Sequence, residues 1–180
     1  MADITCIFLG KRYTRYNKNW VDKNNISVTH FQNELDREYY KTLNLDEMNA
    51  ETLLYEGDIC KEHKSVDVAL LYYRRAIGLA DGKQLFGLFP KISSCYRQQG
   101  QPQKCIELYD EVKQAYGENL ISDAFLTSIA AAYCDMQQYM EAKYFADRAY
   151  ARAGGKASAE LNGVYGRIRK ETTGSGRYEK

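Results

Sequence analysis

Three stretches of similar residues recur at a nearly constant interval, and this recurrence constrains the fold more than any other feature. The stretches begin at Ala69, Cys105 and Ala142, which are 36 and 37 residues apart. The residues four and seven positions later are aromatic, apolar or small: Tyr73 and Ala76, Tyr109 and Val112, and Ala146 and Ala149. Offsets of four and seven lie on one face of a helix. The recurrence therefore predicts three helices that bury equivalent stripes.

A further helical stretch precedes each of these three helices. It carries a bulky residue, then a small one, then in two of the three cases an aromatic one: Leu53, Gly57 and Cys60; Phe89, Ser93 and Tyr96; and Leu126, Ala130 and Tyr133. A small side chain lets a neighbouring helix approach closely. Each repeat is therefore predicted to be a pair of helices joined by a short turn.

This order of residues resembles the tetratricopeptide-repeat family over residues 49–156. The resemblance implies an all-α fold, a right-handed superhelical stack of antiparallel helix pairs with three repeats. The chain departs from the family pattern in three ways. It has no tryptophan at the first bulky position, it has Cys60 in place of an aromatic residue, and no proline closes a repeat.

The regions outside the repeats have different patterns. Residues 1–48 are predicted to form an N-terminal segment, in which an extended arm or a hairpin turning near Gly10 precedes a helix capped by Ser27 or Thr29. Residues 157–172 have apolar positions at helical spacing and are predicted to cap the last repeat. Residues 173–180 are rich in glycine and polar residues, and they are predicted to be a flexible tail.

A loop is expected inside the second repeat. Residues 83–87 contain a glycine shortly before Pro90, which lacks a backbone N–H. We therefore expect a loop or frayed turn over 83–87, with Pro90 in the first turn of the helix that follows.

Composition argues against several classes of protein. The net charge is +1, so no global field favours nucleic acid or membrane. Five cysteines without a CxxC pair match neither a disulfide framework nor a zinc site. No apolar run approaches the roughly 20 residues of a membrane span. Reduced thiols and a cytoplasmic location without membrane binding are expected.

Catalytic motifs are absent from the sequence. The two histidines are His30, beside a predicted helix start, and His63, in a polar stretch where a solvated side chain is expected. No nucleophile elbow, metalloprotease motif or phosphate-binding loop occurs. We therefore expect a non-enzymatic protein without a metal or a cofactor.

The resemblance places partner binding on the concave face formed by the first helix of each repeat. The corresponding polar positions are Asp58, Lys61, Lys91, Ser94, Arg97, Gln98, Thr127 and Asp135. Lys91 and Arg97 have no acid nearby in their own helix, so they are candidates to bind a carboxylate of a peptide. The alternative is that both are ordinary solvated charges.

Residues 11–20 of the N-terminal segment have the most unusual local composition, with basic and aromatic residues interleaved and no acid. The residues concerned are Lys11, Arg12, Tyr13, Arg15, Tyr16, Lys18 and Trp20. Such a composition suits single-stranded nucleic acid, which uses charge for phosphates and rings for bases. It also suits docking onto an acidic protein, or packing of the rings against the first helices.

These patterns together predict an adaptor or scaffold that binds a protein or peptide through the groove, the N-terminal segment or both. Two alternatives remain open, an accessory protein bound to nucleic acid and a sensor of a short peptide. Self-association through tyrosine-rich repeat edges also remains open.

Overall fold

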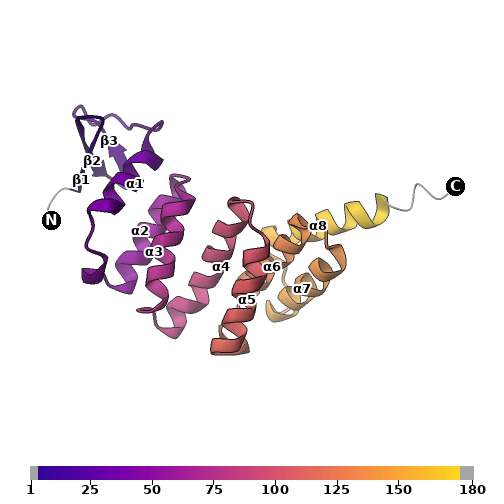
Figure 1. Ribbon diagram of the computed structural model, residues 1–180. Helices are drawn as coiled ribbons and strands as arrows, with labels where there is room; N and C mark the ends of the chain where they lie inside the picture. The colour runs from indigo at the N-terminus through magenta and orange to yellow at the C-terminus, as the bar shows by residue number, and fades with distance from the viewer. Residues whose placement is uncertain (1–3, 175–180) are drawn as a thin grey trace. The chain divides into compact units, whose positions relative to one another are not determined.

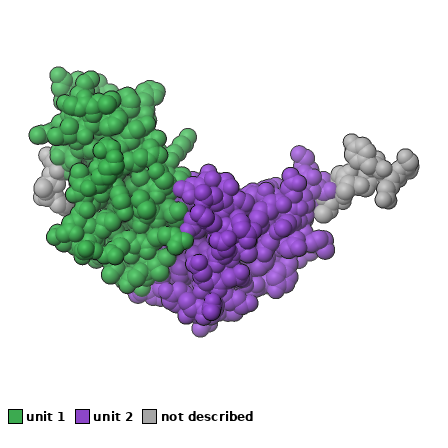
Figure 2. Space-filling model, viewed as in Figure 1, with its two compact units in different colours: residues 1–80 green, residues 81–180 purple. Residues whose placement is uncertain are grey.

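The computed structural model describes residues 4–174, and the chain forms two compact units (Figures 1 and 2). Unit 1 comprises residues 1–80 and unit 2 comprises residues 81–180. Most of the described residues are helical, as predicted. None of the helices in 4–174 is both long enough and apolar enough to cross a membrane.

Unit 1 begins with an antiparallel sheet, so the prediction of an all-α fold is wrong for the N-terminal segment. Its strands are β1 (Thr5–Phe8), β2 (Lys11–Tyr16) and β3 (Asn19–Val21), paired in the order β1-β2-β3. Of the two alternatives left open for this segment, an extended arm or a hairpin near Gly10, the structure has the hairpin, and a second hairpin follows it directly. The high charge of this segment hid its strand alternation.

Both hairpins have two-residue turns. Leu9 and Gly10 join β1 to β2 with φ values of 50° and 73°, and Asn17 and Lys18 join β2 to β3 with 45° and 71°. Positive φ at both central positions characterises the type I′ turn, whose twist matches that of the flanking strands. These turns fix the register, and with it the side chains that face inward.

Helix α1 (Gln32–Thr42) covers the inner face of this sheet (Figure 1). Leu35 of α1 forms a buried cluster with Cys6, Tyr13 and Trp20 of the three strands. The helix starts after Phe31 without a side-chain cap, so the predicted caps at residues 27 and 29 are wrong. The chain runs along β3 before it enters α1, so the helix begins later in the sequence than predicted.

Helices α2 (Ala50–Glu62) and α3 (Val66–Ile77) form a tight hairpin that completes unit 1. A short 3-10 helix, η1 (Leu45–Glu47), precedes them. Gly57 lies against the ring of Tyr73, and a Cβ atom at Gly57 would approach that ring to 2.5 Å. The small residue at this position is therefore required for the close contact of the two helices.

Gly57→Ala is expected to destabilise the protein by about 1–2 kcal/mol. Overpacking of the Tyr73 ring costs about 1–3 kcal/mol, and it outweighs a gain of up to about 1 kcal/mol in helix propensity. Gly163→Ala is the matched control, because a Cβ at Gly163 meets no atom of residues 4–174 within 4 Å. Urea unfolding should show destabilisation for the first variant only, and a stabilised Gly57→Ala would contradict the packing.

The described residues of unit 2, 81–174, form five longer helices and one 3-10 turn, η2 (Glu118–Leu120). The longer helices are α4 (Gly82–Gln98), α5 (Gln103–Tyr116), α6 (Asp123–Asp135), α7 (Tyr139–Arg152) and α8 (Ala159–Gly174). Ala69 in unit 1, and Cys105 and Ala142 in unit 2, are all fully buried near the start of α3, α5 and α7. The recurring small positions therefore lie in helix contacts.

Helix α4 corrects two expectations. Residues 83–87 are helical rather than a loop, because Asp81 and Gln84 form a capping box that starts the helix at Gly82. Pro90 consequently lies well inside the helix and not in its first turn. Its ring lacks the N–H that would donate to the carbonyl of Phe86.

Helix α8 packs against α6 and α7 and buries Leu161, Val164 and Ile168. The predicted capping segment ended at residue 172, whereas the helix continues to Gly174. Residues 175–180 of the predicted tail lie outside the described residues. All five cysteines are buried.

Candidate functional site

Strand alternation divides the basic and aromatic N-terminal segment between two faces. Three of its seven candidate residues point inward: Tyr13, Arg15 and Trp20. The remaining four are exposed: Lys11, Arg12, Tyr16 and Lys18. The seven residues therefore do not form one surface, and two of the three rings pack inside unit 1.

Arg15 joins the sheet to α2 through a buried ion pair. Its guanidinium donates two hydrogen bonds of 2.5 Å to the Glu56 carboxylate, and the side chains are 5% and 6% exposed. Burial alone would lower the pKa of Arg15, but the hydrogen bonds to Glu56, its negative charge and the nearby Tyr39 and Tyr72 together outweigh burial and raise that pKa. The guanidinium also lies over the rings of Trp20 and Tyr39.

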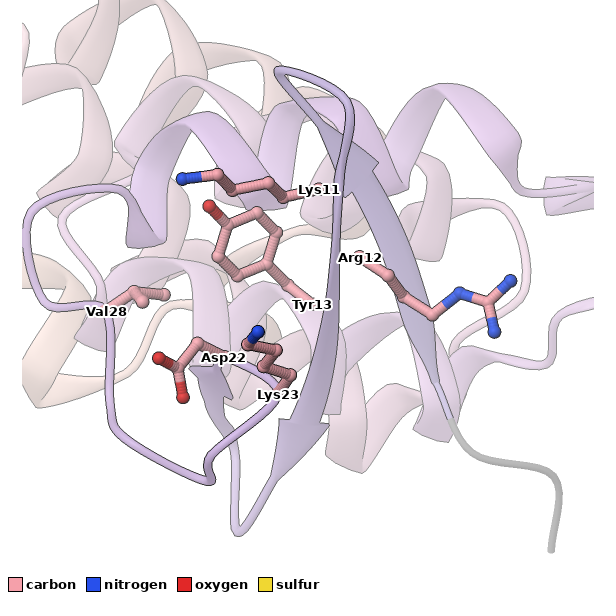
Figure 3. A pocket seen from close by; sticks show the side chains of 6 residues that line it. All are labelled: Lys11, Arg12, Tyr13, Asp22, Lys23 and Val28. Carbon is pink, nitrogen blue, oxygen red and sulfur yellow. The ribbon is translucent and has the colours of Figure 1, made fainter.

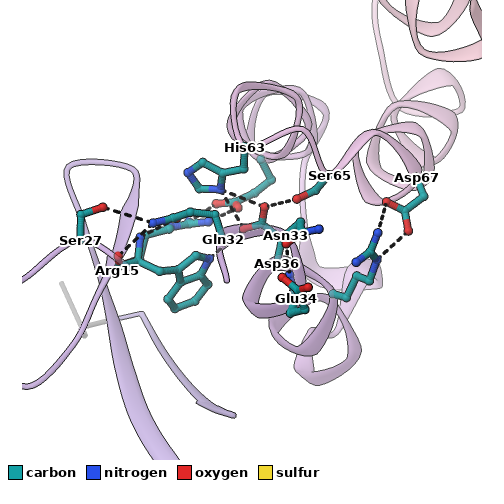
Figure 4. A network of polar contacts seen from close by, with 12 residues as sticks. Arg15, Ser27, Gln32, Asn33, Glu34, Asp36, His63, Ser65 and Asp67 are labelled. Carbon is teal, nitrogen blue, oxygen red and sulfur yellow. Dashed lines mark hydrogen bonds and ion pairs between the residues drawn. The ribbon is translucent and has the colours of Figure 1, made fainter. Parts of the chain in front are cut away.

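Asp36 of α1 is the centre of a second buried network (Figure 4). Its carboxylate accepts hydrogen bonds from the Trp20 indole at 2.8 Å and from the Ser65 hydroxyl at 2.6 Å, and the His63 ring nitrogen Nδ1 lies 2.9 Å away. The expectation of a solvated His63 is therefore wrong. Ser65 is fully buried and donates to the carboxylate, so the network positions the sheet, α1 and α2.

A pocket of about 580 Å³ lies beside β2, where the chain turns after β3 (Figure 3). The Lys11 amine and the Tyr13 hydroxyl point to one side of the strand, and the Arg12 guanidinium points to the other. Asp22 on the wall accepts from two backbone N–H groups, of Asn24 and Ile26, and these hydrogen bonds lower its pKa.

A second hollow, of about 400 Å³, lies between α2 and the turn from β2 to β3. Its lining residues are Lys18, Tyr55, Asp58, Lys61 and Glu62. Lys18 donates to Glu62 at 3.1 Å and lies 5.9 Å from the Tyr55 ring centre. This hollow is where residues of both predicted sites meet, Lys18 from the segment and Asp58 and Lys61 from the groove.

Two side chains of this hollow are available to a partner. Tyr55 is 51% exposed, so about half of its surface is accessible to a partner. Lys61 forms no ion pair with any of residues 4–174. Asp58 instead accepts a hydrogen bond of 2.6 Å from the Tyr73 hydroxyl, which fixes the carboxylate. Tyr55 and Glu62 were missed, although they share a helical face with Asp58.

In unit 2, four predicted groove residues line a hollow of about 450 Å³ together with Glu160, which was not predicted. The four are Ser94, Arg97, Gln98 and Asp135. Arg97 lies 2.8 Å from Asp135 and 3.3 Å from Glu160, and Arg167 of α8 binds the other oxygen of Asp135. Acids from other helices therefore neutralise Arg97, so the structure gives no support to its predicted role as a carboxylate receptor.

The remaining groove candidates differ in accessibility. Thr127 is only 3% exposed, and its hydroxyl donates to the carbonyl of Asp123, so it cannot line a surface. Lys91 is half-buried on α4. Helix α6 is buried on nearly every side, because it also contacts α8. The amphipathic pattern of α6 alone could not reveal this coverage.

The chain matches no known family model, and no curated protein matches it significantly. Within residues 4–174, no group of three or more histidine, cysteine or acidic side chains is arranged to hold a metal ion. The inference of function therefore depends on the surfaces just described.

Proposed function

We propose that the protein is a non-enzymatic adaptor that binds a segment of another protein, and that its helix pairs are tetratricopeptide-like repeats. The burial of Ala69, Cys105 and Ala142 at equivalent helix starts supports the repeat assignment. The hollow lined by Tyr55 and Lys61 is the single observation that favours protein binding. An exposed aromatic ring beside an unpaired cation is typical of interface anchors.

The partner segment is expected to carry a carboxylate for Lys61 and an apolar side chain for the Tyr55 ring. Lys18 and Glu62 neutralise each other in the hollow, and Asp58 is held by Tyr73. A carboxylate of the partner is therefore expected to form its ion pair with Lys61.

Burial of the two N-terminal rings favours a protein partner over single-stranded nucleic acid. Bases stack on exposed aromatic faces, and the rings of Tyr13 and Trp20 are buried in the core of unit 1. Of the three aromatic residues among the seven candidates, Tyr16 is the exposed one.

Site-specific cross-linking tests the proposal. A photoreactive benzoylphenylalanine placed at Tyr55 should yield a discrete cross-linked protein in an extract of the source cells, and Lys61→Glu should abolish that product. The matched control carries the same group at Tyr144, an exposed tyrosine of α7. Identical products from both positions, or a product that survives Lys61→Glu, would rule the hollow out.

A further inference from the structure

The outer edge of β1 has outward-facing backbone groups. The Arg15 N–H donates a hydrogen bond to the carbonyl of Ile4 at 2.8 Å. Along an antiparallel ladder, residue pairs that exchange backbone hydrogen bonds alternate with pairs that do not. Cys6 and Phe8 therefore bond to β2, whereas the N–H and C=O groups of Thr5 and Ile7 face away from it. No backbone group of residues 4–174 bonds to these outward groups.

The opposite edge of the sheet is closed. The side chain of Gln32 accepts from the Trp20 N–H at 2.9 Å and donates to the Trp20 carbonyl at 3.0 Å. The Val28 N–H also donates to that carbonyl. Gln32 and Val28 thus take the place of a neighbouring strand along β3, and β1 has no such cover within the described part of the chain.

β1 carries none of the side chains that protect an exposed edge. Folded proteins guard exposed edges with lysine, proline or a bulge. The residues Thr5–Phe8 include no charged residue and no proline. Ile7 is 66% exposed and Leu9, in the turn that follows, is 78% exposed. An open edge with exposed apolar side chains is the arrangement that accepts an added strand.

The charge of the outer face indicates what kind of strand would bind. By register this face presents Thr5 and Ile7 of β1 and Arg12, Thr14 and Tyr16 of β2, and none of these is acidic. Ile7 lies directly opposite Arg12, which forms no ion pair within residues 4–174. A residue added beside Ile7 would lie about 10 Å from Arg12, two strand spacings, which arginine and glutamate side chains span together.

We propose that β1 binds an extended, acidic segment of a partner protein by strand addition. Backbone bonds form to Thr5 and Ile7, apolar side chains of the segment cover Ile7, and a carboxylate pairs with Arg12. The inference goes beyond the proposed function, because none of the residues that line the hollow belongs to this edge.

Selection from a random library of displayed eight-residue peptides tests the proposal on the full chain. The enriched peptides should alternate apolar and polar residues and contain aspartate or glutamate. Ile7→Pro removes an outward N–H without breaking a bond to β2, and it should weaken these peptides at least about tenfold. Arg12→Glu should weaken them roughly fivefold, whereas Tyr55→Ala, a change in the hollow, should leave their affinity unchanged.

Folding of the variants is checked with the emission of Trp20. If Ile7→Pro does not fold, Ile7→Lys replaces it, because a lysine guards the edge and retains every backbone bond. Three results would overturn the proposal: no enrichment, enriched peptides without acids, or peptides that bind the folded residue 7 variant as tightly as the natural chain. Concentration-dependent protection of the Thr5 and Ile7 amides without peptide would also overturn it, because the occupant would then be a second copy.

Discussion

Glu56→Ala is expected to lower the free energy of unfolding by about 3–5 kcal/mol. The change leaves the Arg15 guanidinium charged and almost fully buried without its partner. It also removes the two hydrogen bonds that join β2 to α2. Urea unfolding followed by the emission of Trp20, the single tryptophan of the chain, measures this loss.

A double variant separates two contributions to the stability loss, the unpaired buried charge and the lost side-chain volume. Arg15→Met with Glu56→Leu removes both charges and keeps similar volumes, and such replacements are often neutral or stabilising. We therefore expect the double variant to be several kcal/mol more stable than Glu56→Ala. A Glu56→Ala protein within about 1 kcal/mol of the natural chain would show that the pair is solvated, contrary to its burial.

Asp36→Ala is expected to cost about 3 kcal/mol, since each buried polar group left unsatisfied costs about 1–3 kcal/mol. The carboxylate is the acceptor for the Trp20 indole and the Ser65 hydroxyl, and it contacts His63. Because Trp20 loses its hydrogen bond directly, its emission should also change in the folded state.

Asp67→Ala provides the matched control for Asp36→Ala. Asp67 belongs to the same unit and pairs with Arg37 at 2.8 Å, but the two side chains are 49% and 42% exposed. An exposed pair of this kind contributes about 0–1 kcal/mol. Equal losses for the two aspartates would contradict the buried network.

Much of the helical part of the fold could be predicted from the local periodicity of the sequence. The small residues Gly57, Ala69 and Cys105 could be placed in buried helix faces, because helix packing imposes a period that the sequence retains. The strands were harder to recognise. In β2 the inward residues are Tyr13 and Arg15, and a buried arginine disguises the alternation that normally identifies a strand.

The polar contacts could not be predicted, because they join residues far apart in the chain. Arg15 and Glu56 are 41 positions apart, and Arg97 and Asp135 are 38 apart. The sequence near Arg97 contains no acid, so its neutralisation by other helices left no local signal. The hydrogen bond between the Gln32 side chain and the backbone of β3 likewise depends on tertiary structure.

The affinity of the partner recovered by cross-linking at Tyr55 tests the central claim most directly. Titration with the natural chain and with a Tyr55→Ala, Lys61→Glu variant should show a loss of at least about tenfold, because both proposed anchors are removed. The control pair Tyr144→Ala, Lys143→Glu, on the exposed surface of α7, should bind as the natural chain does. Unchanged affinity in the first variant, or an equal loss in both, would contradict the assignment of the hollow as the binding surface.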